Sequence, residues 1–400
     1  MALPDVPAQT AATLPADVLA ALSTTTDLLA TWWPAALLGT AAVGAGALAV
    51  RGHGRSGRAG PTGRSRARTV VAAMAAVVLV ALAGAAGANT ASGYVPSVAA
   101  ARFWVSGHLQ HAAGHVEGVR VPVRPGSGLD PTTTYVYTPP GYDPDGAQRY
   151  PVVYLFHGTP GTSQDWFSGG QAAHTLDVLI AHHLVPPVLL VAPDLGSPST
   201  SDTECLDSTR PGGPQVETHV GDVVRWVDAH YATVADPGHR VVAGMSMGGY
   251  CALDQGLRHP ETYGAIAALE PYGDPGDGGR AMLETQEQLD AVSPSHYVPT
   301  MTFSRRTPVF LDLAADGDAQ AASDVDAIAD QLAAAGQPVL LRTEPGTTHS
   351  WTMARQGFPY GLVWTLAQLG LAPPAGAQAA AAMAPAGSVG AQPLPAAVSS

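Results

Sequence analysis

A glycine-rich segment surrounds Ser246, with the sequence GMSMGG at residues 244–249. It follows the run RVVA and precedes a helical pattern that begins at Tyr250. A serine hydroxyl is a good nucleophile only when it is held clear of its backbone beside a base, which a sharp strand-to-helix turn achieves. The flanking glycines permit that crowding, and the amide of Met247 can donate to an oxyanion. We therefore predict a nucleophilic Ser246; a chance match in a chain with 45 glycines is the alternative.

Two uncharged apolar stretches lie near the start of the chain, at residues 32–50 and 69–89. Each has about 20 residues, enough to cross a bilayer as a helix. A cleaved signal peptide is the alternative for the first stretch, but no positively charged region precedes it. A buried helix is the alternative for the second. We predict two transmembrane helices, preceded by an extracytoplasmic segment at residues 1–31.

The loop between the two stretches, residues 51–68, contains six Arg and no acidic residue. Such a loop alone would resemble a nucleic-acid patch, but between two spans the positive-inside rule assigns it to the cytoplasm. The chain has 19 basic and 32 acidic residues, so outside the loop 19 − 6 = 13 basic residues face 32 acids. This acidic balance argues against a nucleic-acid partner. We predict a two-pass protein of the cell membrane whose large domain is extracytoplasmic.

Strand and helix patterns alternate after a connector at residues 90–117. A mostly parallel α/β sheet with helices on both faces is therefore expected for residues 118–371. The remaining residues, 372–400, are uncharged and rich in Ala and Pro, which predicts disorder. Strands are expected at residues 119–123, 133–137, 152–156, 188–191, 240–243, 265–269, 309–313 and 339–343, with helices at 216–231, after Ser246 and at 325–332.

Four segments of this region carry a family resemblance: PPGY at 139–142, LFHG at 155–158, the serine turn, and PGTTHSW at 345–351. The region resembles the "Putative esterase" branch of the α/β-hydrolases, which contains esterase D-like enzymes, feruloyl esterases and the mycolyltransferases of cell envelopes. The resemblance implies an α/β-hydrolase fold with a serine nucleophile, an acid and a histidine in that chain order.

The base is predicted to be His349, because a loop after the last strand can return an imidazole to Ser246. In the resembling family the second oxyanion donor follows the His-Gly pair, which here implies the amide of Thr159. Its neighbour Pro160 has no amide hydrogen and cannot serve.

The acid has two candidates in the segment LAADGD at residues 313–318. The family pattern, counted back from Gly336, favours Asp318, with Asp316 as the alternative. Asp274, after the preceding strand, is the next candidate. A mycolyltransferase-like member would be expected to carry Glu at the acid position, so an Asp there favours an esterase.

The chain has two cysteines, Cys205 and Cys251. An exported domain permits a disulfide between them, and two unpaired cysteines are the alternative. No metal-binding motif is present in the sequence, and no cofactor is expected.

The sequence thus predicts a membrane-anchored serine esterase that acts on a small-molecule or lipid ester through Ser246, His349 and Asp318. Acyl transfer to a sugar or lipid hydroxyl is the first alternative. A non-catalytic, envelope-binding domain of the same fold is the second.

Overall fold

The structure is a computed structural model that describes residues 10–11, 14–23, 28–55, 63–107, 113–196, 201–371 and 384–385. Most of the predicted tail at 372–400, much of the segment 1–31 and residues 56–62 of the Arg-rich loop lie outside the described residues. Two short strands, β1 (Thr10–Ala11) and β10 (Ala384–Pro385), pair antiparallel.

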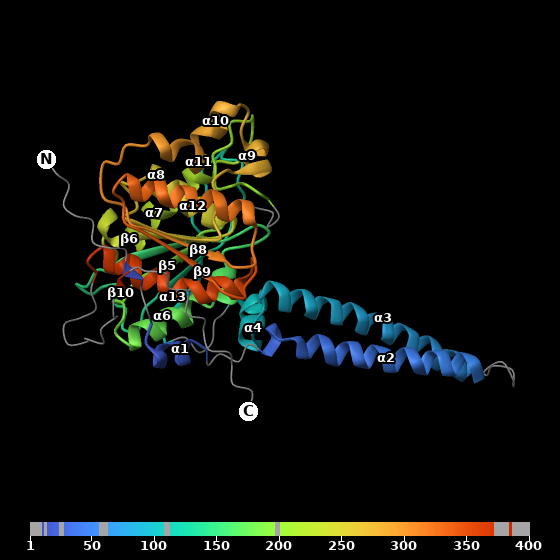
Figure 1. Cartoon of the computed structure of the whole chain (residues 1–400). Helices are drawn as coiled ribbons and strands as arrows, with labels where there is room; N and C mark the ends of the chain where they lie inside the picture. The colour runs from blue at the N-terminus through green and yellow to red at the C-terminus, as the bar shows by residue number, and fades with distance from the viewer. Residues whose placement is uncertain are drawn as a thin grey trace.

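An eight-stranded sheet forms the centre of the large domain, in the order β2-β3-β5-β4-β6-β7-β8-β9 (Figure 1). The six strands from β5 to β9 along this order run parallel, and β3 and β2 complete the sheet by antiparallel pairing. The predicted mostly parallel sheet is therefore confirmed. The strands are β2 (His115–Val119), β3 (Thr134–Thr138), β4 (Val152–Phe156), β5 (Leu189–Ala192), β6 (Arg240–Met245), β7 (Ala265–Leu269), β8 (Val309–Ala314) and β9 (Val339–Glu344).

The first strand differs from its prediction. It was expected at 119–123 and lies at His115–Val119. Pro122 falls inside the expected range, and a proline has no N–H to donate to the sheet ladder. The strand therefore ends before Pro122.

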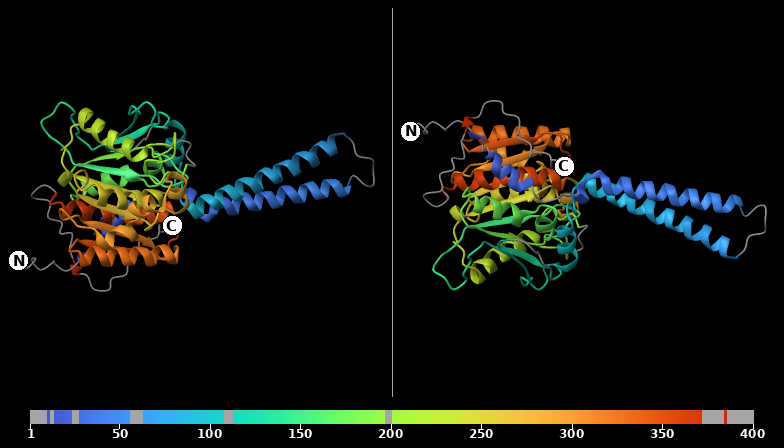
Figure 2. Two further views of the ribbon diagram at one scale, coloured as in Figure 1. Left: turned by 90° about the horizontal axis from the view of Figure 1, so that it is seen from above. Right: turned by 90° about the horizontal axis from the view of Figure 1, so that it is seen from below.

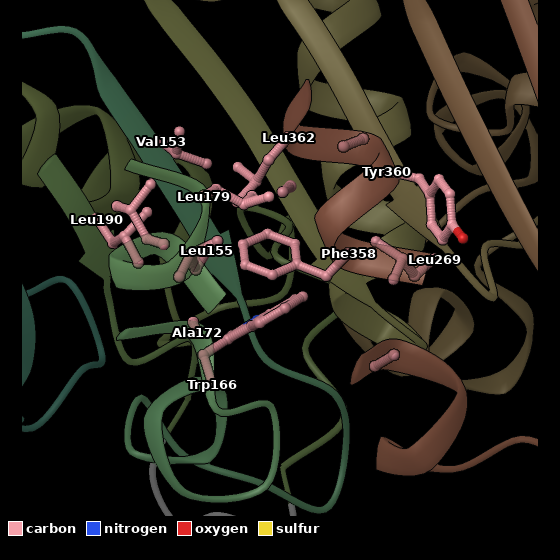
Figure 3. Close-up of a cluster of buried hydrophobic side chains, with 14 of the residues drawn as sticks. Val153, Leu155, Trp166, Ala172, Leu179, Leu190, Leu269, Phe358, Tyr360 and Leu362 are labelled. Atoms are coloured by element: carbon pink, nitrogen blue, oxygen red, sulfur yellow. The ribbon is translucent and has the colours of Figure 1, made fainter. Parts of the chain in front are cut away.

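Helices cover both faces of the sheet because successive side chains of each strand point to opposite faces. Val153 and Leu155 of β4 belong to the core beneath α6 (Ala172–Ala181) and α13 (Trp351–Gln368), as Figure 3 shows. Tyr154 belongs to the opposite core. That core packs under α7 (Val216–His230), α8 (Met247–Arg258) and α12 (Ala319–Ala334). The remaining helices of the domain are α1 (Ala16–Ser23), α5 (Asp165–Ser168), α9 (Gly276–Met282), α10 (Gln286–Ala291) and α11 (Pro294–Tyr297).

Helices α2 (Trp32–Arg55) and α3 (Gly63–Ser92) form a hairpin that projects from the domain (Figures 1 and 2). Both contain candidate membrane spans by length and composition, at Trp32–His53 and Arg66–Ser92. Their apolar side chains are exposed along the hairpin, including Val43 at 74% and Val77 at 69%. The helices are longer than the predicted spans. α2 continues to Arg55 and α3 already begins at Gly63, so both reach into the Arg-rich segment.

The base of the hairpin is joined to the segment that enters the domain. Asn89 Nδ2 donates to the carbonyl oxygens of Leu29 and Val95, and its Oδ1 accepts from the Val95 amide at 2.7 Å. A short helix, α4 (Val98–Ser106), follows. The predicted connector is thus structured at its start.

Candidate active site

The turn at Ser246 joins β6 to α8 in a strained backbone conformation. Ser246 has φ 62° and ψ −125°, a region that non-glycine residues rarely occupy and that is found at functional turns. A Cβ at Gly244 would overlap the carbonyl oxygen of Gly248, and one at Gly248 would overlap that of Phe156. Only glycine allows these backbones to approach so closely. The turn predicted from the sequence therefore forms, with Ser246 between β6 and α8.

His349 lies on the loop between β9 and α13. Its Nε2 is 2.8 Å from Ser246 Oγ, as the sequence predicted for the base. Ser350 follows it and caps α13 by accepting from the Met353 amide. This cap fixes where the helix begins and therefore where the imidazole projects.

The carboxylate against His349 belongs to Glu270, the residue that directly follows β7. Its Oε2 is 2.8 Å from His349 Nδ1, and its other oxygen accepts from the Ala314 amide. The Glu270 amide donates to the carbonyl oxygen of Asp312 at 2.7 Å, and Glu270 has φ 50°. Because a carboxylate accepts from Nδ1–H, Nε2 is the nitrogen that can accept the Ser246 proton.

Neither of the two acids favoured by the sequence occupies this position against His349. Asp318 is exposed and caps α12, where its Oδ1 accepts from the amides of Gln320 and Ala321, each at 2.9 Å. Asp316 is also exposed, and its amide donates to Thr347. Asp274, the next candidate, accepts from the Gly276 amide and from Ser293 Oγ. The prediction of the acid was wrong, because Asp318 is used in a helix cap, Asp274 in a turn, and Asp316 is exposed, while Glu270 contacts His349.

The second predicted oxyanion donor lies beside the first. Thr159 Oγ1 donates to the sulfur of Met247 at 2.7 Å, so the two residues are in contact. As the first residue of α8, Met247 has an N–H without an acceptor inside the helix. A Cβ on Gly158 would lie 3.6 Å from Ser246 Oγ, which shows how closely this segment passes the serine.

His157 holds the segment before Thr159 in place. Its Nε2 accepts from the Leu195 amide at 3.0 Å, so Nδ1 carries the proton and donates to the Gly158 carbonyl at 2.9 Å. The side chain is buried and both ring nitrogens contact backbone atoms, so His157 positions this segment.

A group of buried polar residues lies behind Glu270. Burial and the charge of Glu344 raise the pKa of Asp312 well above its usual range. Glu344 pairs with Arg342 at 2.9 Å, and the Arg342 guanidinium lies 3.7 Å from the centre of the Tyr360 ring. These contacts leave Glu270 as the carboxylate directed at His349.

The loop before α7 is tied to the helix that follows the serine. Cys205 and Cys251 form a disulfide with their Cα atoms 5.8 Å apart, so the pairing considered from the sequence is present. The adjacent Glu204 is buried and accepts hydrogen bonds from Tyr272 Oη at 2.8 Å. Burial and the nearby Asp202 carboxylate raise the pKa of Glu204 to about 9, against the effect of the Tyr272 hydrogen bond.

A pocket of about 300 Å³ adjoins His349 and Glu270. Its other lining residues include Tyr272, Leu313 and Ala322, which are apolar over most of their surface. Among the described residues, no group of three or more His, Cys, Asp or Glu side chains is arranged to hold a metal ion.

The sheet order and the serine turn define the fold as that of the α/β-hydrolases. The sequence profile of the "Putative esterase" family matches residues 129–359, more than half of the chain. The chain belongs to this family.

Three relatives share part of their sequence with this chain. An uncharacterized protein of Corynebacterium glutamicum is 32% identical over 164 residues, which are 41% of this chain and 37% of the relative. A protein of Mycobacterium tuberculosis named as an esterase is 34% identical over 143 residues, 35% of this chain and 28% of the relative. An endo-1,4-beta-xylanase/feruloyl esterase of Xylanibacter ruminicola is 32% identical over 164 residues, 40% of this chain and 21% of the relative. The chain therefore spans well under half the length of each of these relatives.

Two solved structures share the fold. A ferulic acid esterase matches with a TM-score of 0.54 and 21% identity, over 63% of this chain and 97% of that one. An S-formylglutathione hydrolase from Agrobacterium tumefaciens matches with a TM-score of 0.55 and 16% identity, over 65% of this chain and 98% of that one. At these identities the likeness concerns the fold.

Proposed function

We propose that this protein is a membrane-anchored serine esterase that hydrolyses carboxylic esters outside the cytoplasmic membrane. The observation that carries the proposal is the continuous set of contacts from Glu270 through His349 to Ser246, with both distances at 2.8 Å. This is the geometry that nucleophilic acyl transfer requires. Membership of an esterase family points to the same chemistry.

In the proposed reaction, Ser246 Oγ attacks the acyl carbon while its proton passes to His349 Nε2. Glu270 keeps the Nδ1–H tautomer and stabilises the imidazolium that forms. The amides of Met247 and Thr159 bind the oxyanion. His349 then protonates the leaving alkoxide, which departs as the alcohol. A water molecule, deprotonated by His349, next attacks the acyl-serine and releases the acid, which restores Ser246.

The hairpin and the disulfide support the membrane anchor and its orientation. The far end of the hairpin carries the Arg-rich segment, and an Arg-rich loop is retained in the cytoplasm. The domain at the other end then lies outside. Its disulfide between Cys205 and Cys251 is of the kind that persists outside a reducing cytoplasm.

Acyl transfer is a second candidate, favoured by one observation. An Asp in the acid position would have favoured hydrolysis by family resemblance, but the carboxylate against His349 is a Glu. In this alternative an alcohol replaces water in the second step. Adding sugar or lipid alcohols to the assay separates the two reactions by their products.

The test is labelling of the full-length protein with a fluorophosphonate, which reacts with activated serines. We expect labelling at Ser246 and cleavage of acyl esters, both lost in Ser246→Ala by about a thousandfold or more. Thr348→Ala, on the neighbouring exposed loop, is the matched control and should be labelled normally. Equal ester cleavage by Ser246→Ala would contradict the proposal and favour a non-catalytic domain.

A further inference from the structure

The proposed active site lies at the end of the domain that bears the membrane hairpin. Trp351, two residues after His349, packs edge-on against Tyr94 with ring centroids 6.4 Å apart. Tyr94 lies two residues beyond the end of α3 at Ser92. The serine site is therefore separated from the end of the second candidate span by a few packed side chains.

Hydrogen bonds also join the residues directly after α3 to the part of the domain that carries the site. Arg355 of α13 donates from Nη1 to the carbonyl oxygens of Gly93 at 2.9 Å and Gly169 at 2.6 Å. The Tyr94 hydroxyl donates to Asp165 at 2.5 Å, and the same Asp165 oxygen accepts from the Thr162 amide. Thr162 is three residues after the proposed oxyanion donor Thr159. The residues that follow α3 are thus bonded to α13, which follows His349, and through Asp165 to the loop that follows Thr159.

The carboxyl ends of the parallel strands face the hairpin. α13 starts beside the hairpin and returns along the sheet, so the loops at its start, which carry His349, are on the hairpin side (Figure 1). Both views in Figure 2 show the hairpin leaving the domain at this side. A bilayer around the hairpin would therefore face the loops that carry the site.

The helix α4, which follows the hairpin, has an apolar surface that is left exposed in the part of the chain that the structure describes. It buries Phe103 against Tyr135 and Phe167 of the domain. On its other side Val98 is 56% and Val105 85% exposed, and Trp104 is 52% exposed. Two more exposed tryptophans, Trp32 and Trp33, begin α2 at the same end of the hairpin. Tryptophans concentrate where a protein meets the headgroup region of a membrane.

We propose that α4 docks on the outer surface of the bilayer and holds the serine site against it, so that the substrate is a membrane-resident acyl ester. The occupant of this surface is lipid because α4 continues directly from a candidate span through residues 93–97. A helix with one apolar face and one face on its own domain lies in the plane of the membrane interface. The apolar pocket beside His349 would then receive part of the acyl chain.

This substrate class rests on the proposed esterase activity, but the position of α4 can be measured without any catalysis. Both native cysteines are in the disulfide, so an introduced cysteine is the single site for a thiol-reactive fluorophore. Val105→Cys places the fluorophore on the proposed interface. Asp236→Cys is the matched control, because Asp236 is exposed and precedes β6, at the amino ends of the parallel strands and away from the loops that carry the site.

The fluorophore at position 105 should be quenched by brominated lipids in proteoliposomes, because interfacial helices lie about 5–10 Å into the bilayer boundary. The fluorophore at position 236 should not be quenched. Equal accessibility of the two positions to an aqueous quencher would overturn the docking of α4. Shielding of position 105 from the aqueous quencher only after addition of a protein extract, without quenching by brominated lipids, would also overturn it and assign the surface to a protein partner.

The substrate class is tested with two esters in the same proteoliposomes, a long-chain acyl ester in the bilayer and a soluble butyrate ester. The ratio of the two rates should fall about tenfold in Trp104→Ser/Val105→Asp, since the exposed apolar surface is lost. Trp104→Phe/Val105→Leu should leave the ratio of the two rates unchanged. An unchanged ratio in the polar variant would overturn the proposed substrate class. Failure to cleave either ester, without labelling of Ser246, would instead overturn the esterase activity and the substrate class together, and leave the depth measurement valid.

Discussion

His349 Nδ1 lies 2.8 Å from Glu270 Oε2, although 79 residues separate the two in the chain. β7 ends at Leu269 and β9 at Glu344, with β8 between them in the sheet. The acid and the base thus follow strands that are not adjacent. Leu269, the last residue of β7, pairs with Asp312 of β8, and Glu344, the last residue of β9, pairs with Ala314, where β8 ends. The turn after β8 passes beside them, since a Cβ on Gly317 would be 3.5 Å from Glu270 Oε2.

Removal of the disulfide should lower stability substantially. Cys205 and Cys251 are 46 residues apart, and closing a loop of this size stabilises a fold by about 4 kcal/mol in the chain-entropy model. Cys205→Ala/Cys251→Ala should therefore lower the Tm by about 10 °C for a domain of this size. Reductant should lower the Tm of the wild type and leave that of the variant unchanged. Insensitivity of both proteins to reductant would show that the disulfide contributes nothing.

Glu204 should make the domain less stable as the pH rises. Its pKa is raised from 4.5 to about 9 in the folded protein, so the folded state holds a proton that the unfolded state has lost. The resulting stabilisation is fully present below pH 4.5 and is lost as the pH rises toward 9, by at most about 1.4 kcal/mol per pH unit.

Glu204→Gln lacks this titration and can still accept from Tyr272. Urea unfolding at pH 5, 7 and 9 should show a shallower loss of stability in the variant than in the wild type. Parallel pH profiles would mean that Glu204 titrates normally in the fold.

Two glycines should respond in opposite ways to the same substitution. Gly248→Ala should destabilise the domain and inactivate the site, because its Cβ would overlap the Phe156 carbonyl. Gly221 lies in α7, and a Cβ there meets only Arg225 Nη1 at 3.6 Å. Gly221→Ala should therefore stabilise by about 0.5–1 kcal/mol. Thermal unfolding measures both effects, and a well-folded Gly248→Ala with full activity would refute the close packing of the turn.

The orientation in the membrane can be tested in intact cells with an impermeant thiol reagent. A cysteine at Asp277, whose side chain is fully exposed on the domain, should react. A cysteine at His53, near the Arg-rich end of the hairpin, should react only after the membrane is permeabilised. Immediate labelling at position 53 and protection at position 277 would reverse the topology.

Most of the fold could be predicted because its strands carry local signals. The expected ranges 152–156 and 265–269 coincide with β4 and β7, whose side chains are all buried and apolar. Ser246 and His349 were predicted from local motifs as well, and the structure brings their side chains together. Thr159 was placed only by resemblance, and the structure puts it against Met247.

The acid could not be found by the same reasoning because tertiary pairing decides which carboxylate reaches the histidine. The family spacing, counted back from Gly336, led to Asp318. Two local signals favoured Glu270 over Asp318. Asp318 stands directly before a helical run, where an Asp is a typical N-cap. Glu270 is a charged residue directly after the buried strand that pairs with β6. Asp274 also follows β7, but it lies four residues after Glu270.

The most direct test of the account compares Glu270→Gln with Asp318→Asn in the full-length protein, with kcat measured on one acyl ester and folding checked by circular dichroism. Glu270→Gln should lower kcat by at least about a hundredfold, because the amide no longer sets the His349 tautomer or stabilises the imidazolium. Asp318→Asn should lower it by less than about threefold, because asparagine still caps α12. A crippled Asp318→Asn beside a fully active Glu270→Gln would contradict the site described here.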